Sequence, residues 1–344
     1  MSIKKWMLNA RSIALAQSVM PALLAVALAW KCEAFRFWDA ALAVLGVAFA
    51  HLAMNLSDDY FDYKADVLGD RDKVQRQGFR AMMHKYPYLT DGSESLRSTA
   101  KVIATFVGLA LLCGLVIVWD RRENGIWGEQ GLWWIAAIVF SCGFLGVFYS
   151  APPLKLAYRG LGELVIAFIF GPLLMMGVYY ASAGQIAWEV VLISVPVGLL
   201  VLNILFTHSF IDMKGDEQCN KMTFARLLKS RRANLVASFI FIFLPFALVI
   251  LGVCLGVLAW PYLAVLLVLP RGIWLFISLR DYSQGKNVTM DKAPKVIGSI
   301  PDWENYKKAG IEWFMLRWLC ARNLLAGFCL LSIVVSIVLK YWII

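Results

Sequence analysis

Four aspartates that directly follow an apolar run are the residues of this sequence best suited to carry chemistry. They are Asp58, Asp59, Asp62 and Asp66. On a helix, the last three share one stripe with Asn55, at a spacing of i, i+4, i+7 and i+11. Like charges on one stripe repel, so such a helix is stable at low cost only with a cation among them. Oxygen ligands without His or Cys favour a hard cation, Mg²⁺ before Zn²⁺.

A second acidic cluster follows another apolar run. Asp212 and Asp216 are spaced i, i+4 and therefore share a helix face, with Glu217 next to them. A single cluster would also fit a solvated helix end beside a membrane, but two such clusters favour a metal site. Protein-bound Mg²⁺ usually completes its ligand shell with substrate phosphates. The sequence therefore predicts a site in which two carboxylate clusters and Mg²⁺ bind a diphosphate.

Basic residues near both clusters are candidate ligands of that diphosphate. Lys73, Arg76 and Arg80 follow the first cluster at i, i+3 and i+7, and Lys214 and Lys221 lie within and after the second. Arg and Lys side chains bind phosphate oxygens. The alternative for the first three is a role in membrane topology alone.

The segment 149–163 is a third candidate. Two prolines, Pro152 and Pro153, stop an apolar run, and glycines allow a tight turn into the next one. Its polar side chains Tyr149, Lys155 and Arg159 are expected to reach the mouth of a helix bundle. The alternative is an interface loop with an aromatic anchor and cations that extend to water.

Two histidines stand one helical turn before the acidic clusters, His51 before Asn55 and His208 before Asp212. Both are expected to line the wall of the site, although a lone histidine on such a face is more often a packing residue with a hydrogen bond. Aromatic side chains are frequent in the apolar runs, and some of them can shield a carbocation by cation–π attraction.

The elements that position these residues are membrane spans. The chain has 344 residues, of which 60% are hydrophobic and 16% charged, and its mean hydropathy is +0.68. This composition excludes a water-soluble globular protein. We expect an all-α membrane protein with nine spans, at residues 12–30, 38–57, 99–119, 131–150, 162–181, 188–208, 233–254, 258–278 and 323–343.

The distribution of basic residues predicts the orientation in the membrane. With the N-terminus inside, 27 of the 33 Lys and Arg residues fall in inside segments and five in outside segments, and Arg271 lies within a span. This asymmetry places the N-terminus and both acidic clusters in the cytoplasm. The first span lacks a cleavage pattern and is expected to stay in the chain, as part of a multi-pass protein of the cell (inner) membrane. The net charge of +10 is therefore a feature of topology and does not indicate nucleic acid.

Weak internal repetition is also expected. The clusters end the second and the sixth span, each the second of a four-span group, which suggests a shared site on a pseudo-two-fold axis. Residues 58–98 and 280–322 form long inside loops, expected to be functional. In the second loop, Asp302 reads as a helix start, and Trp303, Tyr306, Trp313 and Trp318 predict an amphipathic helix on the cytoplasmic interface.

These motifs resemble the UbiA superfamily of intramembrane prenyltransferases. Asp59, Asp62 and Asp66 match the acidic positions of its first motif, NDxxDxxxD, and Asp212 and Asp216 match its second, DxxxD. The segment 149–163 resembles the corresponding segment of the 1,4-dihydroxy-2-naphthoate prenyltransferases, the menaquinone branch. Lys221 and Thr223 resemble the Lys-x-Thr that the family has shortly after the second motif. Ala10 and Arg11 resemble the Ala-Arg-Pro with which the menaquinone branch opens.

The sequence departs from the family pattern at three places. Asp58 stands where the first motif usually has Asn, and His208, Ser209 and Ile211 replace the residues commonly seen before the second motif. The stretch 76–91 also differs from the expected pattern. These departures concern the acceptor rather than the class of reaction.

The resemblance implies a single domain over residues 1–344, with nine transmembrane helices in a UbiA-type bundle, a pseudo-repeat of four-helix halves and a cytoplasmic cap. It implies Mg²⁺-dependent transfer of a polyprenyl group from polyprenyl diphosphate to an aromatic acceptor, with 1,4-dihydroxy-2-naphthoate favoured over 4-hydroxybenzoate, haem or another lipid precursor. The metal is expected on Asp59, Asp62, Asp66, Asp212 and Asp216. The substrates are expected near Asn55, Asp58, Lys73, Arg76, Arg80, Tyr149, Lys155, Arg159, His208, Lys214 and Lys221.

Three other classes of membrane protein are alternatives. A CDP-alcohol phosphatidyltransferase is disfavoured because Val-Leu-Gly follows Asp66 in place of its DGxxAR signature. A secondary transporter would carry its charged residues near the middle of the membrane rather than at span ends. A non-catalytic protein that binds or transports prenyl lipids is the remaining alternative.

Overall fold

The computed structural model describes residues 3–64, 86–218, 221–286, 290 and 292–342. In these ranges, nine helical runs are long and apolar enough to cross a membrane, as expected. Two of these runs begin with a 3₁₀ helix. In the first, η1 (Ser12–Leu15) leads into α2 (Ala16–Ala29), and in the second, η5 (Trp260–Val268) leads into α14 (Leu269–Ser283). The others are α3 (Phe37–Lys64), α6 (Leu96–Glu123), α7 (Glu129–Ser150), α8–η4–α9 (Gly162–Phe168, Ile169–Leu173, Leu174–Ala183), α10 (Trp188–Ile211), α13 (Arg231–Cys254) and α16 (Glu312–Trp342).

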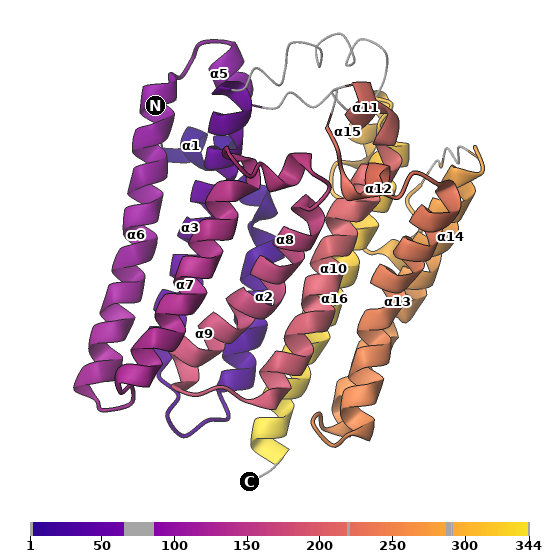
Figure 1. Cartoon of the computed structure of the whole chain (residues 1–344). Helices are drawn as coiled ribbons and strands as arrows, with labels where there is room; N and C mark the ends of the chain where they lie inside the picture. The colour runs from indigo at the N-terminus through magenta and orange to yellow at the C-terminus, as the bar shows by residue number, and fades with distance from the viewer. Residues whose placement is uncertain (1–2, 65–85, 219–220, 287–289, 291, 343–344) are drawn as a thin grey trace.

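The helices stand side by side in one bundle with α10 at its centre (Figure 1). In the most apolar 18-residue stretch of α10, 72% of the residues are buried inside the protein. The corresponding shares for α6 and α7 are 11% and 6%. Helix α10 is therefore surrounded by protein, while α6 and α7 present apolar side chains outward. In a membrane-spanning protein this outward apolar surface faces lipid.

Both acidic clusters lie at one end of the bundle, where α3, α7, α10 and α14 finish and α6, α8, α13 and α16 begin (Figure 1). We call this the acidic end and the opposite one the far end. The short helices α1 (Ile3–Asn9), α5 (Pro87–Thr90), α11 (Met213–Gln218), α12 (Phe224–Leu227) and α15 (Trp303–Lys308) also lie at the acidic end. The pseudo-repeat and the cap stay predictions.

A small separate core fixes the N-terminal segment to the acidic end of α3. Ala10, Leu52 and Leu56 pack with Tyr88 and Leu89, and all are at most 4% exposed. Ser95 begins α6 next to this core with a capping box, in which its hydroxyl accepts from the backbone N–H of Ser98. Helices α1 and α5 are thereby attached to the helix end that carries the first cluster.

Ion pairs hold the far end together. Arg121 Nε lies 2.7 Å from Asp39 Oδ2, and both side chains are at most 3% exposed. Arg121 also donates to the carbonyls of Ala34 and Ser182, which satisfies a guanidinium that would be costly to bury alone. Lys31 pairs with Glu189 at 2.7 Å. These contacts join the segment before α3 and the first turn of α3 to the ends of α6 and α9 and to the first turn of α10.

The prediction of a separate amphipathic helix at residues 303–318 is wrong. Helix α15 has six residues and ends before Gly310, whose φ of +66° breaks the helix. Trp313 and Trp318 belong to α16, which begins at Glu312, eleven residues before the span predicted at 323–343. Asp302 also does not cap the start of a helix with its side chain. Its backbone is left-handed, and its side chain makes no capping hydrogen bond.

The early start of α16 has a physical reason. Arg317 reads as an interfacial charge, yet its side chain is fully buried. It donates to the carbonyls of Ser278 and Trp313, and its guanidinium lies 5.2 Å from the ring centre of Tyr282. Carbonyls and an aromatic face replace the water that a charged side chain normally keeps, so the helix continues through this position.

Candidate functional site

Each of the three described carboxylates of the first cluster, Asp58, Asp59 and Asp62, accepts a hydrogen bond from a hydroxyl on a different segment. Ser150, at the end of α7, donates to Asp58 Oδ1 at 2.5 Å. Tyr88, on α5, donates to Asp59 Oδ2 at 3.1 Å, and Tyr158, in the short turn η3 (Leu156–Tyr158), donates to Asp62 Oδ1.

These hydroxyls orient carboxylates that are already shielded from water, since Asp59 and Asp62 are each 2% exposed. Burial and the charge of Asp59 raise the pKa of Tyr88, so its hydroxyl keeps the proton that it donates. The helical stripe expected from Asn55 to Asp62 is confirmed, because α3 continues to Lys64. Asp66 lies outside the described residues.

Among the residues that the structure describes, Arg11 is a cation that contacts the first cluster. Its Nη2 lies 3.3 Å from Asp58 Oδ2 and 3.2 Å from Asp59 Oδ1, and it donates to the carbonyl of Asn55 at 2.9 Å. The Asn55 amide donates in turn to the carbonyl of Ala10. An always-charged guanidinium at this position offsets part of the repulsion between two adjacent acids.

The second cluster lies at the junction of α10 and α11. Asp212 is the residue that caps the end of α10, and Asp216 lies in the short helix α11; they are 8% and 2% exposed. Tyr282 donates to the carbonyl of Ile211 at 2.7 Å and so ties this junction to the end of α14. A Cβ atom added at Gly215 would lie 2.7 Å from Asp212 Oδ1, so the carboxylate occupies space that only glycine leaves open.

Two loops of the acidic end are joined by backbone hydrogen bonds. Gly160 N–H donates to the carbonyl of Met222 at 2.9 Å, next to a single bridge of parallel β type between Arg159 and Met222. Gly160 has φ of +76°, a conformation that favours glycine. The loop after α7 is therefore joined directly to the segment that leads into α12.

Glu163 reinforces this junction from inside the bundle. Its Oε1 accepts from the Ser209 hydroxyl at 2.8 Å and from the Phe224 backbone N–H at 3.2 Å. Glu163 is on α8, Ser209 on α10 and Phe224 at the start of α12, so one buried carboxylate connects three elements around the second cluster.

Tyr149, near the end of α7, is close to a carboxylate of each cluster. Its hydroxyl is within electrostatic range of both Asp58 and Asp216, which belong to different clusters. Its ring packs against the turn before α8, where a Cβ added at Gly162 would come within 3.3 Å of it. The structure thus places a residue of the third predicted segment near one carboxylate of each cluster.

The predicted cations differ in their placement. Lys155 and Lys221 are half-buried, and the backbone N–H of Lys221 donates to the carbonyl of Asp216. Arg159 and Lys214 are exposed, and the Arg159 guanidinium donates to the carbonyl of Pro153 in its own loop. The remaining predicted cations, Lys73, Arg76 and Arg80, lie outside the described residues.

The two histidines of the predicted wall pack against aromatic rings. His51 is buried, shares a hydrogen bond of 2.6 Å with the Ser18 hydroxyl, and meets Phe170 edge-on. His208 meets Phe314 edge-on, with the ring centres 5.7 Å apart. The packing role that the sequence left open for His51 is therefore the one the structure describes.

The donors at this end fit a hard divalent cation. The four aspartates of 8% exposure or less supply oxygen ligands only, the set that suits Mg²⁺. Within the described ranges, no group of three or more His, Cys, Asp and Glu side chains is close enough to hold a metal by itself. A cation bound here would therefore complete its shell with substrate oxygens or water.

Sequence reasoning missed several residues of this site. Tyr88 and Ser150 donate to the first cluster from distant segments, and Glu163 joins α8 to α10 and α12; none of these three was assigned a role from the sequence, although Ser150 and Glu163 lie in the segment 149–163. Arg11 had a usable signal, because it is the last cation before the first span, at the end that carries the clusters.

Comparison with known proteins agrees with this geometry. A profile of the UbiA prenyltransferase family matches residues 18–293. The 2-carboxy-1,4-naphthoquinone phytyltransferase of Synechocystis sp. is 27% identical over 229 residues, which are 67% of this chain and 67% of that protein. The 1,4-dihydroxy-2-naphthoate octaprenyltransferase of Mycobacterium tuberculosis is 24% identical over 236 residues, 68% of this chain and 73% of that protein.

The fold has a counterpart among solved structures. A UbiA homologue from Archaeoglobus fulgidus, solved with GPP and Mg²⁺ bound, superposes with a TM-score of 0.54 at 17% identity, over 95% of this chain and 99% of that one. Together with the nine apolar helices in the described ranges, the family match makes the protein a multi-pass integral membrane protein. The chain belongs to the UbiA prenyltransferase family and is a prenyltransferase.

Proposed function

We propose that this protein transfers a polyprenyl group from polyprenyl diphosphate to 1,4-dihydroxy-2-naphthoate, with Mg²⁺ as the metal. One observation carries the proposal: the carboxylates of α3 and of the α10–α11 junction lie at the same end of the bundle (Figure 1), with Tyr149 in electrostatic range of Asp58 and Asp216. A diphosphate with divalent cations is the guest that such a pair of oxygen-only clusters suits best.

The metal would be held by Asp59, Asp62, Asp212 and Asp216, and by Asp66 of the first motif. When bound, it supplies Lewis-acid stabilisation of the departing diphosphate. The hydroxyls of Tyr88 and Tyr158 keep the carboxylates of Asp59 and Asp62 in fixed orientations. Such second-layer hydrogen bonds are what hold metal ligands ready for binding.

The cations of the chain hold the diphosphate itself. Arg11 lies beside Asp58 and Asp59, and Lys155 and Lys221 are half-buried on the two loops that are joined through Gly160 and Met222. Because these loops are joined, both lysines are positioned together. Preorganised positive charge favours the state in which the negative charge on the leaving group is largest.

The allylic C–O bond breaks with its electron pair going to the diphosphate. The resulting allylic cation needs protection from water and a negative or aromatic surface beside it. The partly buried Tyr149 ring, packed against Gly162, offers such a surface next to the carboxylates.

The acceptor ring then attacks the allylic carbon and forms the new C–C bond. With 1,4-dihydroxy-2-naphthoate, loss of carbon dioxide restores the aromatic ring; with an acceptor that carries hydrogen at that carbon, a proton is lost instead. The choice of naphthoate rests on the segment 149–163 and on the names of the two curated relatives. The other acceptors, 4-hydroxybenzoate, haem or another lipid precursor, are outcomes of the same assay.

The proposal includes the orientation and extent of the protein. The acidic end faces the cytoplasm, as the distribution of Lys and Arg predicts, in the cell (inner) membrane of its organism. Residues 1–344 act as one prenyltransferase domain. Asn55, Asp58, Arg159, His208 and Lys214 remain proposed substrate-binding residues, as do Lys73, Arg76 and Arg80.

The test is to incubate membranes that contain the protein with Mg²⁺, a labelled polyprenyl diphosphate and a panel of aromatic acceptors. We expect a decarboxylated prenyl-naphthalenediol, identified by its mass, from 1,4-dihydroxy-2-naphthoate. A prenylated product from another acceptor, with none from the naphthoate, would contradict the assigned substrate but keep the reaction class.

A further inference from the structure

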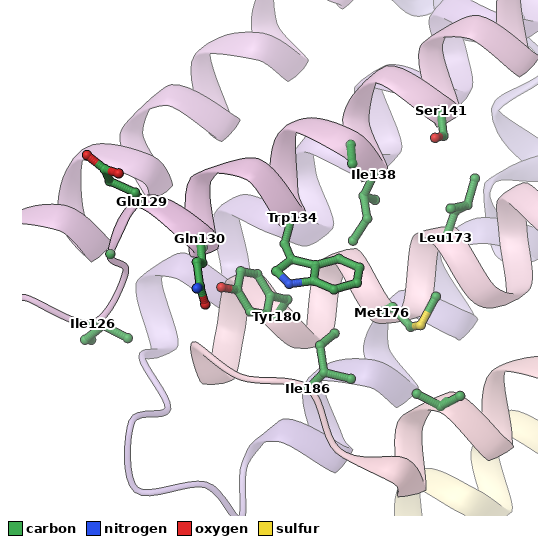
Figure 2. Close-up of a pocket in the computed structure, with 14 residues that line it drawn as sticks. Ile126, Glu129, Gln130, Trp134, Ile138, Ser141, Leu173, Met176, Tyr180 and Ile186 are labelled. Atoms are coloured by element: carbon green, nitrogen blue, oxygen red, sulfur yellow. The ribbon is translucent and has the colours of Figure 1, made fainter.

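A groove at the far end of the bundle lies well away from the acidic site. Its volume is about 850 Å³, within the range of pockets that hold small molecules. One wall comes from the first half of α7, and the others come from η4, α9 and the connection into α10. Figure 2 shows Gln130 and Trp134 on one side and Met176 and Tyr180 on the other, projecting into the same space.

The charge of the lining restricts the ligand. Of the fourteen lining residues, the one charged side chain is Glu129, and none is Lys or Arg. A phosphate headgroup needs cationic partners and would be repelled by this carboxylate. The ligand head is therefore neutral, with oxygen atoms that form hydrogen bonds with the Gln130 amide, which both donates and accepts.

The polar end of the groove carries two aromatic rings. Tyr180 stacks on the buried Trp127, with the ring centres 5.0 Å apart and the planes 16° apart. Its hydroxyl lies over Gly131, where an added Cβ would come within 2.7 Å. Trp134 is 62% exposed and projects from the next turn of α7. A fixed ring and an open one suit a flat aromatic head, because aromatic rings gain from stacked or edge-on contact.

The deeper part of the groove is apolar apart from Ser141. Glu129 and Gln130 are in the first turn of α7, whereas Ile138 lies nine residues further along, about 14 Å deeper at 1.5 Å per residue. Leu173 and Met176 line the same depth from the opposite wall. Polar groups at the membrane surface and aliphatic groups below them match an amphiphile whose chain extends toward the middle of the bilayer. The flexible Met176 side chain adapts to a branched chain.

We propose that this groove is a second ligand site, which binds a neutral prenylated quinol or quinone. The aromatic head lies at Gln130, Trp134 and Tyr180, and the isoprenoid chain lies along Ile138, Leu173 and Met176. The identity of the ligand rests on the proposed function, because this is the class of molecule to which prenylation of a naphthoate leads; the preference for a neutral head rests on the groove alone.

The test uses the purified full-length protein in nanodiscs and a naphthoquinone with a geranylgeranyl chain that carries a photoreactive diazirine. After irradiation, peptides from residues 129–141 and 173–180 are expected to carry the label. Excess unlabelled prenyl naphthoquinone should compete, and phosphatidylglycerol should not. Label confined to peptides of the acidic end, or equal competition by the anionic lipid, would overturn the proposal.

A matched pair of variants shows whether the groove itself is responsible. Ala137 lines the groove, whereas Ala136 is an exposed neighbour that does not. Ala137→Trp fills the space and should reduce labelling of these peptides at least about tenfold, while Ala136→Trp should leave it unchanged. Equal labelling in both variants contradicts the proposal.

Prenyl transfer by the same preparations is measured with Mg²⁺ and diphosphate. The probe is supplied ready-made, so the absence of transfer to the naphthoate would count against the proposed function and leave the labelling result readable. Conversely, normal transfer with no label in the groove would count against the second site alone.

Discussion

At the scale of single residues, the acidic end depends on side chains that hold other side chains. Asp58, Asp59 and Asp62 are adjacent on α3, yet their hydroxyl partners come from α7, α5 and η3. The acids themselves were predictable, because their spacing after an apolar run places them on one helix face. Their partners were not, since a hydroxyl 29 to 96 positions away leaves no periodic signal in the sequence.

Gly215 gives a prediction at this scale. In Gly215→Ala the new methyl group would overlap the Asp212 carboxylate, which lies 2.7 Å from the Cβ position. Displacing a ligand by a fraction of an ångström to 1 Å should lower kcat/KM about 10- to 100-fold with little change in Tm. The control is Gly108→Ala on α6, where the Cβ meets nothing within 4 Å. Unchanged kcat/KM in Gly215→Ala would mean that Asp212 does not need its present position.

Lys155 gives a second prediction at the scale of single residues. If it contacts the diphosphate or the acceptor, Lys155→Ala should lose about 2–4 kcal/mol of transition-state stabilisation. Lys155→Arg should also reduce kcat/KM, since a guanidinium fork does not reproduce a compact ammonium. Lys101→Ala removes an exposed charge at the same end of the bundle and serves as the control. Normal kinetics in both Lys155 variants would return this loop to the role of a membrane anchor.

At the scale of elements, the acidic end is assembled from loops that are attached to one another. The Gly160–Met222 hydrogen bond and the contacts of Glu163 connect the loop after α7 with the loop after α11. The sequence predicted the stop at Pro152, and α7 does end at Ser150. It did not predict the start of α16, because Arg317 reads as an interfacial charge until its carbonyl partners on α14 and α16 are known.

Two glycine variants separate stability from function at this scale. Gly160 and Gly125 both have positive φ, +76° and +65°, so alanine at either position should cost about 1–2 kcal/mol of stability. Gly125 lies at the far end, and its Cβ position is open. Thermal unfolding should shift at least as much in Gly160→Ala, whose Cβ would also lie 3.2 Å from Leu227 Cδ2, and kcat/KM should fall only in that variant. Equal activity in the two variants would show that the joined loops do not position the site.

At the scale of the whole molecule, the bundle separates its two ends by chemistry. The acidic end carries buried carboxylates with Arg11, and the far end carries ion pairs such as Asp39 with Arg121 together with an apolar groove. The number of spans was predictable because apolar length is a strong signal. The groove was not, since it depends on how α7 packs against α9, and the sequence does not encode that angle locally.

Orientation is testable at this scale. Cysteines introduced at Ser93, beside α5, and at Glu123, at the end of α6, lie on opposite ends of the bundle. In a protein with its native cysteines replaced by serine, a membrane-impermeant maleimide should label Glu123→Cys in intact cells and Ser93→Cys in inverted vesicles. The opposite pattern would place the acidic end outside the cell and contradict the charge rule.

The central claim is that the carboxylates of α3 and of the α10–α11 junction form one metal–diphosphate site. The most direct measurement is the initial rate of prenyl transfer by the Asp59→Asn and Asp212→Asn variants, after their insertion and folding have been verified. The reference is the unsubstituted protein, first treated with EDTA and then supplied again with Mg²⁺. Both substitutions keep the shape of the side chain and remove its charge. The expected result is loss of transfer in each variant and in EDTA, with recovery on Mg²⁺ only in the unsubstituted protein; full activity of either variant would contradict a shared site.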